Sequence, residues 1–406
     1  MVRVGILGQG YVGLPLAIEA AKVGFQVFGY DKNSNLISDL MIGKTNLPDL
    51  NSNEIKDLIK QHSYIPSSNP TVLSDCEIFV ICVPTPLDLN NNPDLSYLEE
   101  AVQIIVKYVK NDALIINEST SYPGTLRDFI KPKLEKSSKF SFTFAAAPER
   151  IDPANRDWSI TNTPRVISGL TESATESAFK FYTKFCKSVI LASSPEVAEA
   201  SKLFENTFRL VNISLMNELS EITNALGFSA VEVIKAAATK PFGFVPFFPS
   251  IGIGGHCIPI DPTYLSFVAE KVGYRSEFIT LANKINSSRP KTIAKSIQSI
   301  MGGDLSDKKI QIAGIAYKQN VSDMRESPTP ILIRELKKLG AKSISWCDPL
   351  VKFYNGEQSV PLNSKIDLGL IISPHNEIDF TIWKNSETRV LDLSVGNRNL
   401  GWPKFF

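Results

Sequence analysis

The stretch VRVGILGQGYVGLPLA at residues 2–17 decides the class of fold. Arg3–Leu7 is a candidate buried strand, and Gly8, Gly10 and Gly13 follow it directly, where a helix is expected to begin. In a strand–turn–helix unit such glycines allow a tight turn, close approach of a pyrophosphate to the backbone, and close packing of helix on strand. The helix N-terminus then faces the phosphates. The stretch therefore predicts a dinucleotide-binding Rossmann unit.

An acidic residue follows the next candidate strand, Gln26–Tyr30. Asp31 stands at that strand end, where a carboxylate accepts hydrogen bonds from the ribose hydroxyls of a bound dinucleotide. The same charge would repel the 2′-phosphate of NADP, although neighbouring Lys32 weakens this repulsion. The position of Asp31 therefore favours NAD as the cofactor.

Short apolar strands alternate with amphipathic helical stretches over about the first 190 residues. This alternation is typical of a parallel sheet covered by helices on both faces. The strands expected here are Arg3–Leu7, Gln26–Tyr30, Ile78–Val83, Ala113–Asn117 and Phe142–Ala146. Thr85, Thr120 and Glu149 come soon after strand ends, which is the edge where open α/β sheets bind ligands.

A long helix is expected from Ser194-Pro195, an N-cap followed by proline at the first helical position, to Gly227. A second α/β pattern without the glycine fingerprint begins near Lys308. The fold class predicted is α/β, with two Rossmann-like doubly wound domains joined by this long central helix and a helical region. The domains expected are residues 1–193, 194–300 and 301–406, because 406 residues exceed what one core usually organises.

Bulk composition indicates an ordinary globular protein. Hydrophobic residues make up 43% of the chain and charged residues 21%, and the formal net charge is +1. A nucleic-acid binder is expected to be more basic, and no apolar run reaches membrane-spanning length, so neither nucleic acid nor a membrane is expected as a partner. The five cysteines are scattered and the N-terminus lacks signal-peptide features, so reduced thiols and a cytoplasmic location are expected.

A second glycine-rich stretch, GIGGHCIPID at residues 252–261, presents a thiol. Its three glycines let the backbone approach a substrate closely, Cys257 offers a nucleophile, and Asp261 follows four residues later. An isolated cysteine is more often a small buried hydrophobe, and this interpretation is kept for Cys76, Cys82, Cys186 and Cys347. The setting of Cys257 favours a catalytic role instead.

The three histidines do not indicate a metal site. His62, His256 and His375 lie in unrelated segments, and no cluster supplies three or four ligands. No metal is therefore expected, and His256 is expected to be structural or to contact substrate.

A polar stripe lies on the predicted long helix. Lys202 and Asn206 are four residues apart and hence on one face, with Arg209 a further turn along. A solvated helix face would give the same spacing. The apolar neighbours favour a stripe held inside a mostly buried helix; they are Leu203, Phe204, Phe208 and Leu210. Spacing alone leaves both interpretations open.

Seven motifs, in order along the chain, carry a family resemblance. They are GQGYVGLPLA (8–17), CVPTP (82–86), ESTSYPGT (118–125), APERIDPAN (147–155), KLFENTFRLVNISLMNE (202–218), GGHCIPIDPTYL (254–265) and AYKQNVSDMRESP (316–328). Together they resemble the UDP-glucose/GDP-mannose dehydrogenase family over essentially the whole chain. Seven ordered motifs are far more specific than any single one.

The resemblance implies two NAD-dependent oxidations of the C6 alcohol of a UDP-sugar at one site. The catalytic residues it implies are Cys257, Lys202, Asn206, Asp261, Glu149 and Thr120. Lys202 would stabilise developing negative charge on the C6 oxygen, and Asp261 would help to order a water. Cys257 would attack the aldehyde to give a thiohemiacetal, and Glu149 and Thr120 would assist hydrolysis of the later thioester through water.

The resemblance also implies the binding residues and a homodimer formed through the central helix. The cofactor-binding residues implied are Gly8, Gly10, Tyr11, Val12, Gly13, Asp31, Thr85 and Arg325. The substrate-binding residues implied are Arg150, Arg209, Gly254, His256 and Lys318. Residues 1–193 would bind NAD, residues 194–300 would supply the dimer and active-site region, and residues 301–406 would bind the UDP-sugar. Lys318 and Arg325 would reach the nucleotide phosphates as the active site closes between the two lobes.

Within the family, residues 239–244 and the ESTSYPGT and PERIDPAN forms are most similar to UDP-N-acetylglucosamine 6-dehydrogenases, with UDP-N-acetylmannosamine dehydrogenases as the near alternative. UDP-glucose enzymes carry a second glutamate where this chain has Pro153, and an arginine where it has Lys240-Pro241. Two different functions also stay open. One is that of a two-electron β-hydroxyacid-type dehydrogenase, which would not need Cys257, and the second is that of a catalytically silent NAD-binding regulator or scaffold.

Overall fold

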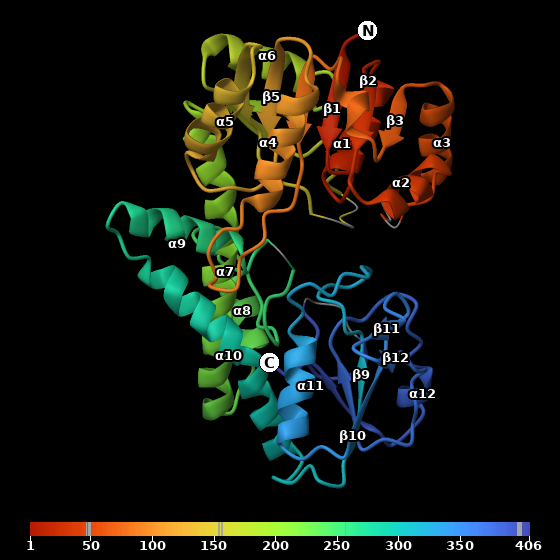
Figure 1. Ribbon diagram of the computed structural model, residues 1–406. Helices are drawn as coiled ribbons and strands as arrows, with labels where there is room; N and C mark the ends of the chain where they lie inside the picture. The colour runs from red at the N-terminus through yellow and green to blue at the C-terminus, as the bar shows by residue number, and fades with distance from the viewer. Residues whose placement is uncertain (46, 48–49, 153–154, 156, 256, 396–399) are drawn as a thin grey trace. The chain divides into compact units, whose positions relative to one another are not determined.

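The computed structural model describes residues 1–406 except 46, 48–49, 153–154, 156, 256 and 396–399. The chain divides into two compact units (Figure 1). The first consists of Met1–Glu205 and Thr263–Tyr274, and the second consists of Asn206–Pro262 and Arg275–Phe406. Two helices, α7 (Pro195–Leu226) and α9 (Asp261–Lys271), contribute residues to both units.

The first unit is built on an eight-stranded sheet in the order β3-β2-β1-β4-β5-β6-β7-β8. Its strands are β1 (Arg3–Leu7), β2 (Gln26–Tyr30), β3 (Tyr64–Ser67), β4 (Ile78–Ile81), β5 (Ala113–Asn117), β6 (Phe142–Ala146), β7 (Arg165–Gly169) and β8 (Val189–Leu191). The strands from β3 to β6 are parallel, and β7 pairs antiparallel with β6. The order 3-2-1-4-5-6 is that of the doubly wound dinucleotide-binding fold.

Helices cover both faces of this sheet. They are α1 (Gly13–Lys22), α2 (Ser34–Met41), α3 (Ser52–Lys60), α4 (Ser96–Tyr108), α5 (Lys131–Ser137) and α6 (Glu172–Tyr182), with a 3₁₀ turn η1 (Pro70–Leu73) and a π-helical turn η2 (Thr125–Ile130). Helices α1, α2, α3 and α6 share one buried apolar cluster with the sheet, while α4, α5, η1 and η2 share another. The predicted two-sided cover is therefore present.

Three strands of the first sheet were not predicted from the sequence: β3, β7 and β8. Strand β3 contains Pro66 and lies at one edge of the sheet, where the missing N–H of proline is tolerated. Strand β8 is three residues long at the other edge, with Ile190 and Leu191 half exposed. Strand β4 ends at Ile81, two residues before the predicted end. Short edge strands bury too little surface to produce a strong apolar pattern.

Helix α7 follows the predicted capping signals. It runs from Pro195 to Leu226, and Gly227 just beyond it has a φ of 85°. A left-handed glycine at this position lets the chain leave the helix without strain. Its 32 residues span roughly 48 Å at about 1.5 Å per residue.

The second unit contains a four-stranded parallel sheet in the order β10-β9-β13-β14. Its strands are β9 (Lys309–Ala313), β10 (Ser343–Cys347), β13 (Leu368–Ile371) and β14 (Arg389–Asp392), beside a hairpin of β11 (Phe353–Tyr354) and β12 (Glu357–Gln358). Its helices are α8 (Ala230–Ala237), α10 (Glu277–Ile300), α11 (Thr329–Lys338) and α12 (Thr381–Lys384). Helices α10 and α11 cover one face and α12 the other. The predicted α/β class with two Rossmann-like units is confirmed.

No helix among the described residues combines the length and apolar character needed to cross a bilayer. The five cysteines, all of which lie in the described part of the chain, form no disulfide there. Within the same residues, no three histidine, cysteine, aspartate or glutamate side chains gather in a way that could hold a metal ion.

Candidate active site

The glycine turn after β1 has room for a dinucleotide. Gly8 has a φ of 93°, and a Cβ added there would lie 2.4 Å from the carbonyl oxygen of Cys82. A Cβ on Gly13 would lie 1.9 Å from the carbonyl oxygen of Gly8. A Cβ on Gly10, in contrast, would meet nothing within 4 Å. The first and third glycines therefore permit the turn and the helix packing, and Gly10 leaves the backbone open to a pyrophosphate, so these residues fit NAD.

Asp31 lies at the end of β2, beside this turn. One carboxylate oxygen accepts a hydrogen bond from the backbone N–H of Gln9 at 2.8 Å, and the other accepts from the N–H of Asn33 at 2.9 Å. Lys32 forms an ion pair with Glu100 at 2.6 Å. Lys32, whose positive charge weakened the argument for NAD over NADP, is thus paired with a carboxylate other than that of Asp31.

Three further predicted cofactor-binding residues follow the carboxyl ends of strands in the first sheet: Tyr11, Val12 and Thr85. Tyr11 and Val12 belong to the turn between β1 and α1. Thr85 follows β4, and its carbonyl oxygen accepts a hydrogen bond from the hydroxyl of Tyr264 at 3.0 Å. This bond ties the segment after β4 to α9.

Glu149 belongs to a buried ionic cluster that the sequence did not reveal. Arg165 at the start of β7 forms ion pairs with Glu118 at 3.0 Å and with Glu149 at 2.6 Å. The hydroxyl of Tyr182 donates to Glu118. All four side chains are buried. Burial and, to a smaller extent, the negative charge of Glu149 raise the pKa of Glu118 to about 7, against the attraction of Arg165.

Arg150, predicted to contact substrate, is committed to other protein groups. Its guanidinium forms an ion pair with Glu205 of α7, with distances of 2.7 and 3.1 Å, and donates to the carbonyl of Pro164 at 2.9 Å. Thr120 is half-buried in the segment after β5. The structure therefore gives Arg150 a role in fixing the segment after β6 against α7.

The glycine-rich loop that carries Cys257 (the thiol loop) meets helix α7 in the second unit. The side-chain amide of Asn206 donates to a carboxylate oxygen of Asp261 at 2.6 Å. The backbone N–H of Asp261 donates to the carbonyl oxygen of Cys257 at 2.8 Å, as α9 begins. Asp261 is buried and Cys257 half-buried. Three of the predicted catalytic residues are thus joined by hydrogen bonds.

Glycines let the thiol loop pack against another loop. A Cβ on Gly254 would lie 2.7 Å from the Cβ of Tyr317 and 2.9 Å from the carbonyl oxygen of Glu326. The N–H of Gly255 donates to the carbonyl oxygen of Arg325 at 3.0 Å. The glycines were expected to let the backbone approach a substrate. Gly254 and Gly255 also leave room for the segment Tyr317–Pro328, which carries Lys318 and Arg325.

The polar stripe of α7 becomes more exposed along the helix. Lys202 is buried, Asn206 is half-buried and Arg209 is exposed. The apolar neighbours lie on both sides of this question, because Leu203 and Leu210 are buried whereas Phe204 is 64% and Phe208 44% exposed in the chain. Large apolar side chains occupy both buried and exposed faces of this helix. Their presence in the sequence therefore does not show whether a given face is buried or solvated.

Two further predicted binding residues, Lys318 and Arg325, belong to the segment that packs against the thiol loop. Lys318 is half-buried in the segment after β9. Arg325 is exposed, and its guanidinium pairs with Asp323 of the same segment at 2.5 Å. His256 lies outside the described residues.

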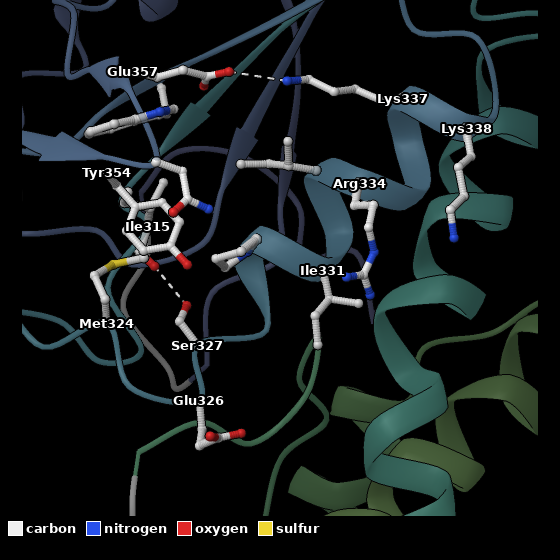
Figure 2. Close-up of a pocket in the computed structure, with 14 residues that line it drawn as sticks. Ile315, Met324, Glu326, Ser327, Ile331, Arg334, Lys337, Lys338, Tyr354 and Glu357 are labelled. Carbon is white, nitrogen blue, oxygen red and sulfur yellow. Dashed lines mark hydrogen bonds and ion pairs between the residues drawn. The ribbon is translucent and has the colours of Figure 1, made fainter. Parts of the chain in front are cut away.

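A cavity of about 840 Å³ lies in the second unit (Figure 2). It is lined by α11, the segment Met324–Ser327 and the β11–β12 hairpin. Its basic side chains have carboxylate partners: Lys337 pairs with Glu357 at 3.1 Å, and Lys338 pairs with Glu335 at 2.8 Å. None of the predicted catalytic residues lines this cavity.

Comparison with known proteins assigns the chain to a family. The UDP-glucose/GDP-mannose dehydrogenase family model for the NAD binding domain matches residues 2–186. The central domain model matches residues 196–288, and the UDP binding domain model matches residues 311–392.

Relatives and solved structures agree with this match. A UDP-N-acetyl-D-glucosamine 6-dehydrogenase of Pseudomonas aeruginosa is 35% identical over 82% of this chain and 80% of its own. A UDP-N-acetyl-D-mannosamine dehydrogenase of Methanocaldococcus jannaschii is 36% identical over 82% of this chain and 76% of its own. The structure of a UDP-D-ManNAc dehydrogenase from Pyrococcus horikoshii has a TM-score of 0.85 at 29% identity, covering 99% of this chain and 98% of its own.

The glycine turn, Asp31 and the doubly wound sheet define a dinucleotide-binding protein whose site fits NAD. The chain belongs to the UDP-glucose/GDP-mannose dehydrogenase family. It is an NAD-dependent oxidoreductase of UDP-sugars. The predicted family, cofactor and enzyme class are confirmed.

Proposed function

We propose that this enzyme oxidises the C6 hydroxyl of a UDP-N-acetylhexosamine to the uronic acid, with UDP-N-acetylglucosamine as the first candidate substrate. The motif forms support this choice, and relatives named for glucosamine and for mannosamine substrates have similar identities of 35% and 36%. UDP-N-acetylmannosamine is therefore the second candidate. Pro153 and Lys240-Pro241 argue against UDP-glucose, whose enzymes have glutamate and arginine there.

The observation that carries the proposal is the hydrogen-bonded set of Asn206, Asp261 and Cys257. In this proposal the Cys257 sulfur bonds to the C6 carbon of the aldehyde, giving a thiohemiacetal. Its oxidation gives a thioester, and water then cleaves the carbon–sulfur bond, releasing the carboxylate and the thiol. NAD, when bound, accepts one hydride in each of the two oxidations.

Lys202 and Asp261 act on the oxygen atoms in this proposal. Lys202 lies one helical turn before Asn206 and is buried, so its ammonium is suited to stabilise negative charge on the C6 oxygen. Asn206 holds Asp261 through their 2.6 Å hydrogen bond, and Asp261 orders the water. Glu149 and Thr120 assist thioester hydrolysis, with the Glu149 carboxylate fixed by Arg165.

Nucleotide binding and assembly complete the proposal. Lys318 would bind the nucleotide phosphates of the sugar substrate, and Arg325 those of the cofactor; Arg209, Gly254 and His256 would contact substrate. Large apolar side chains of α7 are 52–65% exposed: Leu215, Ile222, Phe204 and Leu226. Such a face supports a homodimer formed through this helix. The enzyme would act in the cytoplasm.

The test is an NADH-release assay with UDP-GlcNAc, UDP-ManNAc, UDP-GalNAc and UDP-Glc. Two NADH per sugar with UDP-GlcNAc preferred is the expected result. A preference for UDP-Glc would refute the substrate assignment, and one NADH per substrate with a stable aldehyde or ketone product would refute the four-electron reaction.

A further inference from the structure

A buried aspartate–histidine pair lies beneath the loop that carries Lys318. Nε2 of His375 lies 3.0 Å from a carboxylate oxygen of Asp348, and both side chains are about 1% exposed. Asp348 follows β10, and His375 follows β13, so the pair joins two strand ends of the second sheet. Neither residue has a part in the chemistry proposed above.

Both partners hold the backbone of this loop. Asp348 accepts hydrogen bonds from the N–H of Ile315 at 2.9 Å and of Ala316 at 3.3 Å. Nδ1 of His375 accepts from the N–H of Asn320 at 2.9 Å. The pair therefore holds the chain two residues before Lys318 and two residues after it.

The contacts fix the tautomer of the histidine. Nδ1 accepts a hydrogen bond from a backbone N–H, so the ring proton of neutral His375 is on Nε2, which donates to Asp348. Burial opposes ionisation of Asp348, yet the hydrogen bond from His375 and those from backbone N–H groups hold the pKa of this carboxyl below its ordinary value. A charged acceptor beneath the loop strengthens each of these hydrogen bonds.

Other contacts bring the same loop close to the sheet. Ser373 donates from its hydroxyl to the carbonyl of Ala316 at 2.6 Å. Gly314 has a φ of 79°, and a Cβ there would lie 1.9 Å from the carbonyl oxygen of Ser373. Asn320, with a φ of 62°, accepts from the N–H of Asn376 at 3.0 Å. The loop therefore has a defined backbone path around Lys318.

Asp348 differs in its surroundings from Asp31, the aspartate at the corresponding position of the first unit. Asp31 directly follows the second strand of the first Rossmann unit, and Asp348 directly follows the equivalent strand, β10, of the second. Asp348 is buried and accepts from Leu350 and Val351 as well as from the loop, whereas Asp31 is only half-buried. The carboxylate of Asp348 therefore accepts its hydrogen bonds from the protein backbone and from His375, and not from a ribose.

We propose that Asp348 and His375 are positioning residues that fix the loop of Lys318 and thereby set the affinity for the UDP part of the substrate. The inference rests on the proposed function, in which Lys318 binds the nucleotide phosphates. It assigns both residues to substrate affinity and not to catalysis or to NAD binding.

Two substitutions separate the two contacts of the histidine. His375→Asn keeps an acceptor near the Nδ1 position for Asn320 and loses the donor to Asp348. His375→Gln keeps a donor near the Nε2 position and loses the acceptor. Isothermal titration of the full chain with UDP is expected to show about fivefold weaker binding for each variant, the usual value of one lost hydrogen bond. The Kd for NAD and kcat are expected to stay within about twofold of the wild-type values.

A double-mutant cycle tests whether the histidine acts through the lysine. Lys318→Met is expected to weaken UDP binding more than either histidine variant, and the double variant K318M/H375Q is expected to bind no worse than K318M. Gln311→Met is the matched control, because Gln311 is buried in β9 and makes two hydrogen bonds, to Pro361 and Asn363, outside this loop. It is expected to lower Tm without changing UDP affinity.

The inference is overturned if H375N and H375Q bind UDP as the wild type does, if the cycle is additive, or if K318M leaves UDP binding unchanged. Equal weakening by Q311M would show a general loss of stability and would also overturn it. A coupled cycle in an enzyme that binds UDP but oxidises no UDP-sugar would support the inference while refuting the proposed function.

Discussion

The side chains of Asn206 and Asp261 are joined by a 2.6 Å hydrogen bond between residues that are 55 positions apart in the chain. The amide lies on α7, and the carboxylate begins α9, where its backbone N–H also donates to the carbonyl of Cys257. The orientation of the carboxylate next to the thiol loop is thus set by the long helix.

Replacing Asn206 by alanine is expected to lower kcat about 10- to 100-fold, because Asp261 loses the group that orients it. Steady-state rates with saturating UDP-sugar and NAD provide the measurement. Asn212→Ala is the matched control, since Asn212 lies on the same helix and donates to the carbonyl of Phe208, one turn away, at 2.7 Å. A similar loss in both variants would point to damage to the helix and contradict the assignment.

Replacing Cys257 by serine is expected to reduce formation of the uronic acid by about 10³-fold or more, because the serine hydroxyl stays protonated at neutral pH and is a far poorer nucleophile toward the aldehyde than a cysteine thiolate. Mass spectrometry of the sugar product distinguishes alcohol, aldehyde and acid. Cys347→Ser, at another half-buried thiol, is the control. Full turnover by C257S would favour the two-electron reaction.

Replacing Asp31 by asparagine is expected to raise KM for NAD about tenfold and to reduce discrimination against NADP, because the negative charge facing the ribose is removed while the side-chain shape is kept. Initial rates measured with NAD and with NADP give KM for NAD and the ratio of kcat/KM for the two cofactors. Lys32→Ala is expected to change neither value by more than about twofold, since Lys32 is paired with Glu100. A larger effect of K32A would show that the lysine faces the cofactor.

Replacing Arg165 by methionine is expected to lower the free energy of unfolding by about 3–5 kcal/mol, because two carboxylates, Glu118 and Glu149, stay buried without their cation. Urea unfolding followed by tryptophan fluorescence measures the change. Arg127→Met removes the exposed pair with Glu196 and is expected to cost less than about 1 kcal/mol. Equal losses would mean that burial does not govern the strength of these pairs.

Glu199 is expected to make the free energy of unfolding of the enzyme depend on pH. Its carboxyl accepts from the N–H groups of Gly124 and Leu126, and burial raises its pKa to about 8 despite these bonds. Since the folded pKa exceeds the unfolded one, its contribution is complete below about pH 4.5 and is lost as the pH rises through about 8.

The difference in unfolding free energy between the wild type and Glu199→Gln is therefore expected to fall from about pH 5 to about pH 9. Glu196→Gln is the control, because the hydrogen bond from Arg127 lowers the pKa of Glu196 to about 2. Its contribution is constant over the same window and is lost only in acid. A constant wild-type difference for E199Q would show that Glu199 stays ionised in the folded protein.

Local signals in the sequence were enough to place much of the fold. The predicted bounds of β1, β2, β5 and β6 coincide with those observed. Helix α7 begins and ends where the proline and Gly227 indicated. Such signals are local because hydrophobic periodicity, proline and glycine act through the backbone of their own segment.

The tertiary structure alone decided how distant side chains pair. Strand β7 carries Arg165, whose partners come from segments after β5 and β6, and no spacing in the sequence relates the three. The family resemblance grouped Asn206 with Asp261, but their direct hydrogen bond, like that of His375 with Asp348, is visible only in the fold. Sequence patterns report which face of an element is buried, whereas a buried polar contact depends on chain segments brought together by the packing of the whole unit.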